Sequence, residues 1–533
     1  MLIGYVSDER YLAVGDVLFE FTNEYHTVQS RSSASGAVHA DLESGTYTAT
    51  LQREGFGPKR VQINSKQGKP YHFRLLSNAL LGYAWPKVVK SGESSEFRVH
   101  ALEAYKIDLW RYGYEKEHIQ SLGWYDEHGP RATMQITPDG DYTQTGVMWN
   151  KFGYSSPHHK QYVQAPDRSG LYYFHAKGES GAFFSFPWVV APKSPTADIA
   201  ILASDMNWNA YNSFGGRSNY IHPDKFPHTP TINARLELKR YTDPDHINYD
   251  CEDYDPLSFD RPEPINMIPE NTNIIHPIAG RAACHVAPAE WRFLGWLERE
   301  NFDYDLYSET QFHNDILSLD AYKLLIITTH PEYWTRKMYD TLKVWVHKRG
   351  GKLMYLGGNG LNCEVEMLDK ITMKVKNGDA RKMQKQKKES RFHLYNESEA
   401  NLLGIVFSNE GIMTAAPYQV IDCEHWIFSG TGLQNGDQFG HESLHERIPG
   451  GASGHETDKT SPSSPENIQI VARGMNPDNG GAEMVYYDTQ SGGEVFSVGS
   501  ITYPSSILID TKISQITRNV VERFVNKADS PGI

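Results

Sequence analysis

Three polar segments of the sequence each follow a short apolar run and carry side chains that can bind a metal or move a proton. Those side chains are two phenols, an imidazole, a carboxylate and an amide: Tyr211, Tyr220, His330, Glu332 and Asn359. Imidazole, phenol and carboxylate groups serve as general acids and bases, and an amide can orient a substrate or a developing oxyanion. The chemistry they suggest is hydrolysis at a polar pocket.

These segments must be positioned by the elements that precede them. Residues 324–327 form an apolar, β-branched run that is typical of a strand buried on both faces. After Thr335, apolar residues recur at helical spacing, and Gly350-Gly351 ends the predicted helix. Runs 198–203 and 352–356 predict two more buried strands. Because chemistry in open α/β sheets gathers at the carboxyl ends of the strands, we expect the polar side chains to meet there.

A structural role for the same residues is the alternative interpretation. The tyrosines can pack a glycine-containing loop, and Glu332 can stabilise the N-terminus of the helix that follows it, where an acidic side chain is favourable.

The chain of 533 residues is too long for a single core, so several domains are expected. Residues 1–77 predict a small β-sandwich of the prealbumin or regulatory-domain kind, and residues 78–195 predict a second β-sandwich or jelly roll. Residues 196–533 predict a doubly wound α/β domain, a fold that glutamine amidotransferases share. The predicted fold class is therefore multidomain, with two all-β modules before a C-terminal α/β domain.

Composition narrows the class of function. The net charge of −14 argues against nucleic acid as a partner. The sequence holds no apolar run of about 20 residues, the length that crosses a bilayer, and no signal-peptide pattern at Met1. Four scattered cysteines fit a reducing compartment. We therefore expect a cytoplasmic protein without a membrane segment.

Several motifs together resemble one family. They lie in order along the predicted α/β domain, at 210–220, 258–262, 330–334, 357–360, 451–458 and 493–500. These pieces look like the catalytic domain of N,N-dimethylformamidase large subunits. The resemblance implies an enzyme that hydrolyses a small-molecule amide, with a mononuclear iron, Fe³⁺, as cofactor.

The resemblance also implies residue roles. Carried onto matching positions, the metal ligands are Tyr211, Tyr220 and Glu332, and the surrounding catalytic residues are His330, Asn359 and Glu456. The two tyrosines lie closer together in this sequence than in the family, so Tyr254 is kept as the alternative second tyrosine. The family further implies an accessory small subunit, and we expect a homo-oligomer.

The chemistry of the residues supports this ligand set independently. Two phenolates and a carboxylate are hard, anionic oxygen donors that suit a hard trivalent ion. Tyrosine is already known as an iron ligand in haem proteins. Such an ion can polarise an amide carbonyl and lower the pKa of water.

Two other hydrolytic sites are weighed against it. His441-Glu-Ser-Leu-His445 fits the zinc-protease pattern, but that mechanism needs both histidines on one face of a helix, and the flanking glycines argue against one. Cys363 is a candidate nucleophile, although Asn359 occupies the turn where it would be needed. We expect Cys363 in a helix, as a buried or incidental thiol. A non-catalytic binding or assembly protein built on β modules is the remaining alternative.

Overall fold

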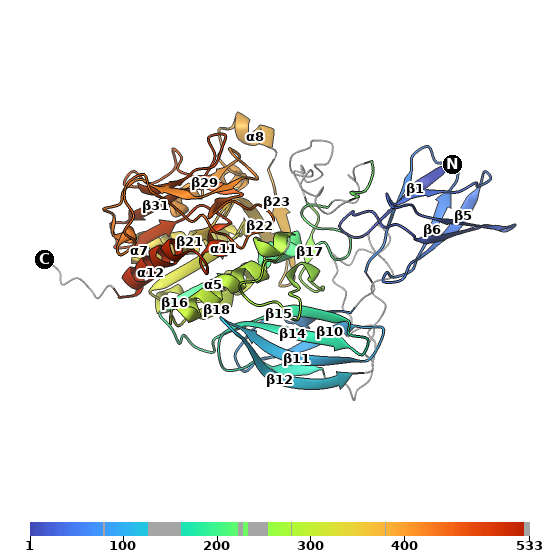
Figure 1. Cartoon of the computed structure of the whole chain (residues 1–533), viewed down its shortest axis with the longest axis horizontal. Coiled ribbons are helices and arrows are strands. Elements are labelled where there is room, and N and C mark those ends of the chain that lie inside the picture. Colours follow the sequence, from blue (N-terminus) through green and yellow to red (C-terminus); the bar gives the residue numbers. More distant parts are fainter. Residues whose placement is uncertain are drawn as a thin grey trace.

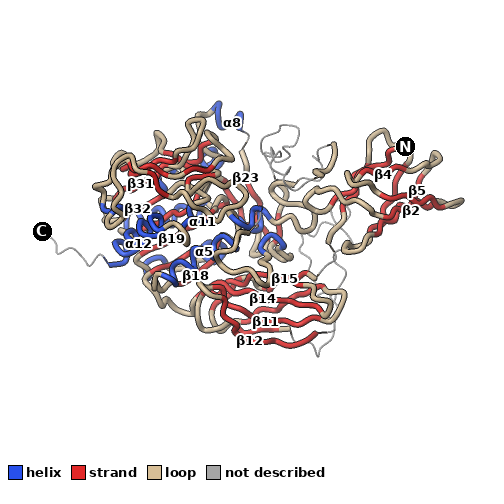
Figure 2. The backbone as a smooth tube through the Cα atoms, in the orientation of Figure 1, coloured by secondary structure: helices blue, strands red, loops and turns tan. Residues whose placement is uncertain are grey.

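The computed structural model describes residues 1–77, 80–125, 161–221, 228–232, 254–278, 280–378 and 380–526 (Figure 1). In the described part of the chain before residue 199, regular structure consists of strands only, and helices appear after it (Figure 2). The all-β character of the N-terminal region is confirmed. The two domain boundaries at 77 and 195 stay a prediction.

The first β unit has two small sheets around its own core. One has the order β4-β1-β7 and the other β3-β2-β5-β6. Their strands are β1 (Leu2–Ser7), β2 (Leu18–Thr22), β3 (Thr27–Arg31), β4 (Ala37–His39), β5 (Thr46–Gln52), β6 (Lys59–Asn64) and β7 (Tyr71–Arg74). Inward residues alternate with outward ones along β5, so that Tyr47, Ala49 and Leu51 pack with Phe19 and Phe73. This unit lies at one end of the molecule (Figure 1).

The second β unit also has two sheets, with the orders β13-β10-β8 and β12-β11-β14-β15-β9. Its strands are β8 (Leu81–Trp85), β9 (Val88–Lys90), β10 (Ser94–His100), β11 (Tyr105–Tyr112), β12 (Lys116–Tyr125), β13 (Tyr162–Gln164), β14 (Gly170–Gly178) and β15 (Phe183–Ala191). Phe97, Leu109, Phe174 and Trp188 fill the core between them. Ser169, just before β14, exchanges hydrogen bonds with the backbone of Leu306, which joins this unit to the C-terminal region.

A nine-stranded mixed sheet organises the C-terminal region, in the order β18-β16-β19-β21-β32-β31-β30-β26-β27. Its parallel half comprises β16 (Ile199–Ala203), β18 (Asp305–Ser308), β19 (Leu324–Thr329), β21 (Lys352–Gly357) and β32 (Glu494–Ser497). Its antiparallel half comprises β26 (Tyr418–Val420), β27 (Gln438–Phe439), β30 (Gln469–Gly474) and β31 (Glu483–Asp488). The parallel strands follow the order 2-1-3-4-5, one of the common orders of doubly wound sheets. The likeness to glutamine amidotransferases stays a prediction.

The described helices of this region are α3 (Asp205–Tyr211), α5 (Ala287–Arg299), α6 (Glu309–His313), α7 (Arg336–Arg349), α8 (Ala380–Lys385), α9 (Arg391–Tyr395), α10 (Ala400–Leu403), α11 (Tyr503–Ser506) and α12 (Thr511–Asn526), with 3₁₀ turns η4 (Pro264–Asn266), η5 (Gly280–Ala283), η6 (Leu319–Ala321) and η7 (Trp426–Phe428). Of these, α5, α6, α10, α11 and α12 contact strands of the nine-stranded sheet. The prediction for α7 is confirmed: Thr335 accepts a hydrogen bond from the backbone N–H of Met338, and Gly350 ends the helix in the left-handed conformation. None of the helices in the described residues is long and apolar enough to span a membrane.

Short strands complete the C-terminal region around the sheet. β17 (Leu257–Ser258), β20 (Tyr333–Trp334), β22 (Cys363–Met367) and β23 (Thr372–Lys376) form a four-stranded sheet, and β24 (Val406–Ser408), β25 (Ala415–Ala416), β28 (Ser453–Gly454) and β29 (Thr457–Lys459) form two short ladders. Cys363 therefore begins a strand, and the expectation of a helix there is wrong. Cys363 is part of a strand because it pairs with Tyr333 in the parallel ladder between β20 and β22.

Candidate functional site

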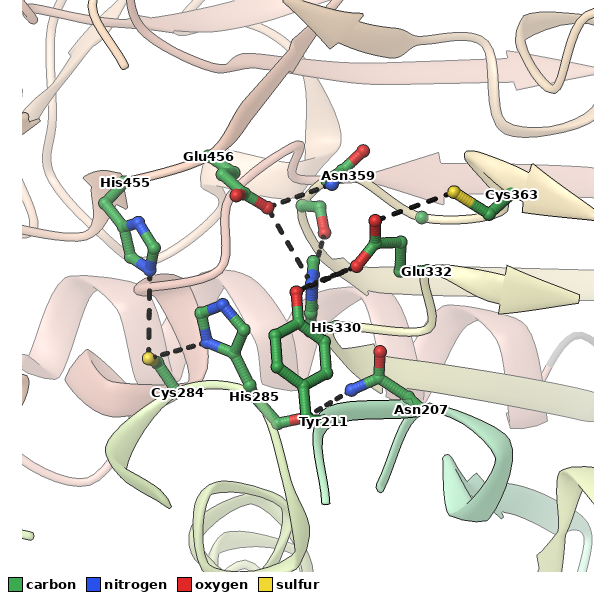
Figure 3. Close-up of polar contacts among 12 residues, drawn as sticks. Asn207, Tyr211, Cys284, His285, His330, Glu332, Asn359, Cys363, His455 and Glu456 are labelled. Atoms are coloured by element: carbon green, nitrogen blue, oxygen red, sulfur yellow. Dashed lines mark hydrogen bonds and ion pairs between the residues drawn. The ribbon is translucent and has the colours of Figure 1, made fainter. Parts of the chain in front are cut away.

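The predicted polar segments meet at the carboxyl ends of the parallel strands (Figure 3). β16 leads into α3, whose last residue is Tyr211, and the loop after α3 carries Tyr220. β19 leads into His330 and Glu332, and β21 leads into Asn359. Gly215 and Gly216 both adopt a positive φ, near 90°, which a side chain would resist and which lets the loop fold back to bring Tyr220 over Tyr211.

Three oxygen atoms from this set lie in mutual contact. Tyr211 Oη lies 2.8 Å from Glu332 Oε2 and 2.6 Å from Tyr220 Oη. Tyr220 Oη lies 3.0 Å from the same Glu332 oxygen. The two phenol rings stack with centroids 4.5 Å apart, and Tyr211 and Glu332 are both buried. The structure thus brings together the three residues that the family resemblance implies as metal ligands.

Of the two candidate second tyrosines, Tyr220 is the one whose hydroxyl contacts both Tyr211 and Glu332. Its hydroxyl also lies 2.7 Å from the hydroxyl of Tyr333, which in turn accepts a hydrogen bond from Asn219 Nδ2. Tyr254, the alternative, is buried and interacts electrostatically with Arg391.

His330 is fixed by hydrogen bonds at both ring nitrogens. Nδ1 lies 3.0 Å from the Gly358 carbonyl oxygen, which can only accept, so this nitrogen carries a proton. Nε2 lies 2.9 Å from Tyr211 Oη and 3.0 Å from Glu332 Oε2. Burial opposes a charge on the ring, but the hydrogen bond and charge of Glu332, joined by the charge of Glu456, raise the pKa of His330 above its ordinary value.

Glu332 shows the reciprocal effect. Burial favours its neutral form, yet the hydrogen bond and charge of His330, with the hydrogen bond from Tyr211, hold the pKa of Glu332 below its usual range. Glu332 is therefore an anion in this pocket, and its second oxygen, Oε1, accepts a weak hydrogen bond from the Cys363 thiol at 3.7 Å.

Glu456 and Asn359 form the opposite wall. Asn359 Nδ2 donates to Glu456 Oε2 at 2.9 Å, and the same oxygen lies 3.7 Å from His330 Nε2. Burial and the charge of Glu332 raise the pKa of Glu456, although the positive charge of His330 acts against them. A carboxylate with a raised pKa and a fixed orientation is suited to accept a proton from water.

Asp458 holds this wall in place. Its Oδ1 accepts the backbone N–H of Asn359 at 2.7 Å, and its Oδ2 accepts the hydroxyl of Tyr355 at 2.7 Å. Asn359 adopts a positive φ of 53°, a conformation that asparagine tolerates better than most residues. Gly358 passes so close to the Glu456 backbone that an added Cβ would collide with its carbonyl oxygen. The loops after β21 and β28 are thereby locked together.

The donor set fits a hard metal ion. Two phenol oxygens and a carboxylate oxygen, all hard donors, lie within 3.0 Å of one another. Burial, with the charge of Glu332, raises the pKa of both Tyr211 and Tyr220 well above the ordinary value. A cation among them would oppose this effect, because metal binding displaces ligand protons.

Two histidines and a cysteine beside the pocket were missed by the sequence reasoning. Cys284 and His285 lie in the turn between η5 and α5, and His455 lies just before Glu456. The His285 ring centroid is 4.4 Å from that of His330 and 5.0 Å from that of Tyr211. No motif spacing marks these residues, since they come from irregular segments. The proximity of Cys284 to His285 in sequence was the only available signal.

Arg281 was also missed. Its guanidinium lies over the rings of Tyr211 and Tyr220, at 5.0 and 4.8 Å from their centroids. Such a cation–π contact holds the two phenols from above and adds positive potential beside their oxygens.

The zinc-protease alternative does not have the geometry it requires. Residues 441–445 contain no helix, and His441 is exposed whereas His445 is buried. His445 Nδ1 accepts the backbone N–H of Ile448 at 3.0 Å, so the proton of its neutral ring is on Nε2. Among the described residues, His445 Nε2 is buried without a hydrogen-bond partner, and His445, Cys284 and His455 each offer one ligand-type atom within 4.8 Å of the others.

With this geometry in place, the comparisons with known proteins assign a family. Residues 107–515 match the model of the N,N-dimethylformamidase beta subunit-like family, C-terminal part, and the chain belongs to that family. All six expected site residues lie inside the matched range.

Two curated relatives carry the same name. The N,N-dimethylformamidase beta subunit of Paracoccus aminophilus is 23% identical over 508 residues, and that of an Alcaligenes species is 22% identical over 507 residues. Each alignment covers 79% of this chain and 63% of the relative, so the chain spans less than two thirds of the length of these proteins. The expected family is therefore confirmed. The expectation of a large subunit is not supported, because both relatives are named beta subunits.

A solved structure gives a weak match. The cold-adapted β-galactosidase from Rahnella sp. R3 has a TM-score of 0.26 and 10% identity, covering 44% of this chain and 27% of that one. A score this low carries no argument about fold or function.

Proposed function

We propose that the chain is an iron-dependent amidohydrolase that cleaves the C–N bond of a small amide. The family name supports hydrolysis of an amide in general, because its relatives are named for dimethylformamide. The observation that carries the proposal is the contact between Tyr211 Oη, Tyr220 Oη and Glu332 Oε2, all within 3.0 Å of one another. Hard oxygen donors gathered in one place are suited to Fe³⁺.

Tyr211, Tyr220 and Glu332 would hold the iron, with His330 Nε2 beside them. When bound, the ion supplies Lewis acidity, which polarises an amide carbonyl and makes water more acidic. The remaining steps belong to the side chains around it.

Glu456 is the base in this proposal. Its Oε2, oriented by Asn359 Nδ2, accepts a proton as the water oxygen forms a bond to the carbonyl carbon. Its raised pKa brings the carboxylate closer to the pH at which a base works well. General-base catalysis of this kind contributes about 10²–10⁴-fold to the rate.

His330 completes the cycle. Its Nε2 lies 3.7 Å from Glu456 Oε2, and its pKa is raised. The proton that Glu456 takes from water can pass to Nε2 and from there to the leaving nitrogen as the C–N bond breaks, which returns both side chains to their starting state. The products are a carboxylic acid and an amine. Asn359 keeps the base in one orientation throughout.

The assembly is a further part of the proposal. The relatives are beta subunits by name, and this name supports a second kind of subunit beside this chain. An accessory small subunit, a homo-oligomer and a cytoplasmic location stay predictions. The β units before β16 are proposed to serve contacts between chains or to narrow the pocket.

Metal content and amine release test the proposal together. The full chain is expected to purify with one iron per chain and a phenolate-to-iron absorption band, and to release amine from formamides, ureas or longer amides. Zinc bound in a His445-dependent way would favour the zinc hydrolase. A folded chain without metal or turnover would favour a non-catalytic binding or assembly protein.

A further inference from the structure

The loop that connects Tyr211 to Tyr220 is buried, although it contains neither a helix nor a strand. Of residues 212–219, all but Ser213 and Arg217 are buried. Buried backbone carbonyl groups need hydrogen-bond partners, because an unpaired one costs as much free energy as a lost hydrogen bond. The groups that bind the carbonyls of this loop therefore fix the position of Tyr220.

Arg261 supplies these partners, and its side chain is itself fully buried. Its Nη1 donates to the carbonyl oxygens of Asn212 at 3.0 Å and of Phe214 at 2.7 Å. Its Nη2 donates to the carbonyl oxygen of Asn209 at 2.9 Å. One planar guanidinium thus holds the backbone on both sides of Tyr211, a task that suits its rigid fork of N–H donors.

The second β unit holds both the loop and the segment that carries the guanidinium. In the segment 258–263, Asp260 Oδ1 accepts hydrogen bonds from Tyr83 Oη of β8 at 2.5 Å and from Arg98 Nη1 of β10 at 2.6 Å. Phe214, in the loop itself, is 1% exposed and packs in the hydrophobic core of this β unit. The loop is therefore attached to the second β unit by an apolar side chain and, through the segment 258–263, by a charge-assisted hydrogen bond.

We propose that Arg261 and Phe214 are positioning residues that place Tyr220 against Tyr211, so that the second β unit is an integral part of the metal site. This inference rests on the proposed function, because it takes Tyr220 as an iron ligand. Both residues act through the loop, and neither is assigned a contact with the ion. The proposal also accounts for the motif at 258–262, which contains none of the six expected site residues.

A double-mutant cycle tests whether Arg261 acts through Tyr220. Arg261→Lys keeps the charge, but its single nitrogen cannot reach all three carbonyl groups that the guanidinium binds. We expect the affinity for iron(III), measured by competition with nitrilotriacetate, to fall about 10–100-fold. In the Tyr220→Phe background, which already lacks the second phenol, the same substitution should change the affinity by less than about twofold. A fall of equal size in both backgrounds, or an unchanged affinity in Arg261→Lys, would overturn the proposal.

The phenolate-to-iron band provides a reading that a general loss of stability would not change. Per bound iron, the band of Arg261→Lys should weaken toward that of Tyr220→Phe, because the second phenol no longer meets the ion. Arg74→Lys is the matched control, since Arg74 is also buried and its Nη2 donates to a backbone carbonyl, that of Glu9, in the first β unit. The control should keep the wild-type band and affinity. A wild-type band per iron in Arg261→Lys would show that Tyr220 stays in place, against the proposal.

Phe214→Leu repeats the test from the other attachment and decides the question if Arg261→Lys does not fold. The smaller side chain loosens the contact of the loop with the β core, so iron affinity should fall in the wild-type background and stay unchanged in the Tyr220→Phe background. Phe186→Leu, a substitution of the same size in the same core, should leave iron affinity unchanged. Urea unfolding shows which variants are folded. Equal losses in Phe214→Leu and Phe186→Leu would assign both residues a general packing role and overturn the proposal.

These readouts separate the two proposals, because they measure iron binding and not turnover. A wild-type chain that binds iron but releases no amine from any amide rejects the proposed hydrolysis and does not affect the outcome of the cycle. A wild-type chain that hydrolyses amides, with additive losses in the cycle, rejects this inference alone. A wild-type chain that binds no iron rejects both.

Discussion

Tyr211 and Glu332 are 121 residues apart in the sequence, yet the phenol oxygen of one lies 2.8 Å from a carboxylate oxygen of the other. The pairing of β16 with β19 produces this contact, because the two parallel strands end side by side and deliver the residues that follow to one place.

Tyr211→Phe is predicted to lower iron content and turnover. The substitution removes one oxygen donor but keeps the ring that stacks on Tyr220, so the fold should persist. Iron per chain and the absorption band measure the result. Tyr503→Phe is the matched control, because it removes a buried hydroxyl that bonds Thr517 in another part of the fold. Equal iron in Tyr211→Phe and wild type would contradict the assignment.

Glu332→Ala is predicted to lose both iron and turnover, by about 100-fold or more, since even outer-shell changes cost 10–100-fold in metal affinity. His441→Ala should leave both nearly intact, because His441 is exposed and lies outside any helix. Iron content and amine release, both measured on the two variants, test this prediction. Loss of metal in His441→Ala with iron retained in Glu332→Ala would reverse our conclusion.

Asn359→Ala is predicted to move the acid side of the pH profile. The amide N–H stabilises the anionic form of Glu456 and so lowers its pKa. Without this hydrogen bond the pKa of Glu456 rises further, and kcat/KM should reach its plateau at a higher pH than in the wild type. A profile of kcat/KM against pH, measured from pH 5 to pH 9, shows the direction of this shift. A shift to lower pH would argue against Glu456 as the base.

Glu290→Gln is predicted to stabilise the protein at alkaline pH. Burial raises the pKa of Glu290 from 4.5 to about 8, so the folded chain keeps a proton that the unfolded chain loses between these values. The free energy of unfolding therefore falls as pH rises through this window, by about 1.4 kcal/mol per pH unit for this group. Glutamine retains the Oε1 that accepts from Trp208 Nε1 but has no proton to lose.

Urea unfolding at pH 5, 7 and 9 measures this effect. The stability advantage of Glu290→Gln over the wild type should grow between pH 5 and pH 8 and then level off. Glu424→Gln, at an exposed glutamate, is the control and should follow the wild type. A constant difference at all three values would mean that Glu290 titrates normally.

Much of the sheet could be predicted because its strands are short apolar runs with clear ends. The apolar run 324–327 lies in β19. The helix that follows begins after Thr335 and ends at Gly350, as predicted. The antiparallel half, from β31 to β27, was harder to predict, since its strands are brief and pair across long loops.

The site was predictable only where it sits directly after such strands. Tyr211, Glu332 and Asn359 were found in this way, and Glu456 came from family resemblance. His285 and Cys284 lie in a turn with no hydrophobic periodicity, so their position depends on long-range packing that a local pattern does not encode. Asp510 shows the same limit on a smaller scale: its Oδ1 accepts the N–H groups of Lys512 and Ile513 in the first turn of α12, a contact that the sequence analysis did not predict.

The tight approach of Gly358 to the Glu456 backbone has an evolutionary consequence. Any drift that gave this position a side chain would push the base away from the amide that aims it, even if every polar residue were retained. Change in what this candidate site binds must therefore come from other residues around it, while these two loops are inherited as a unit.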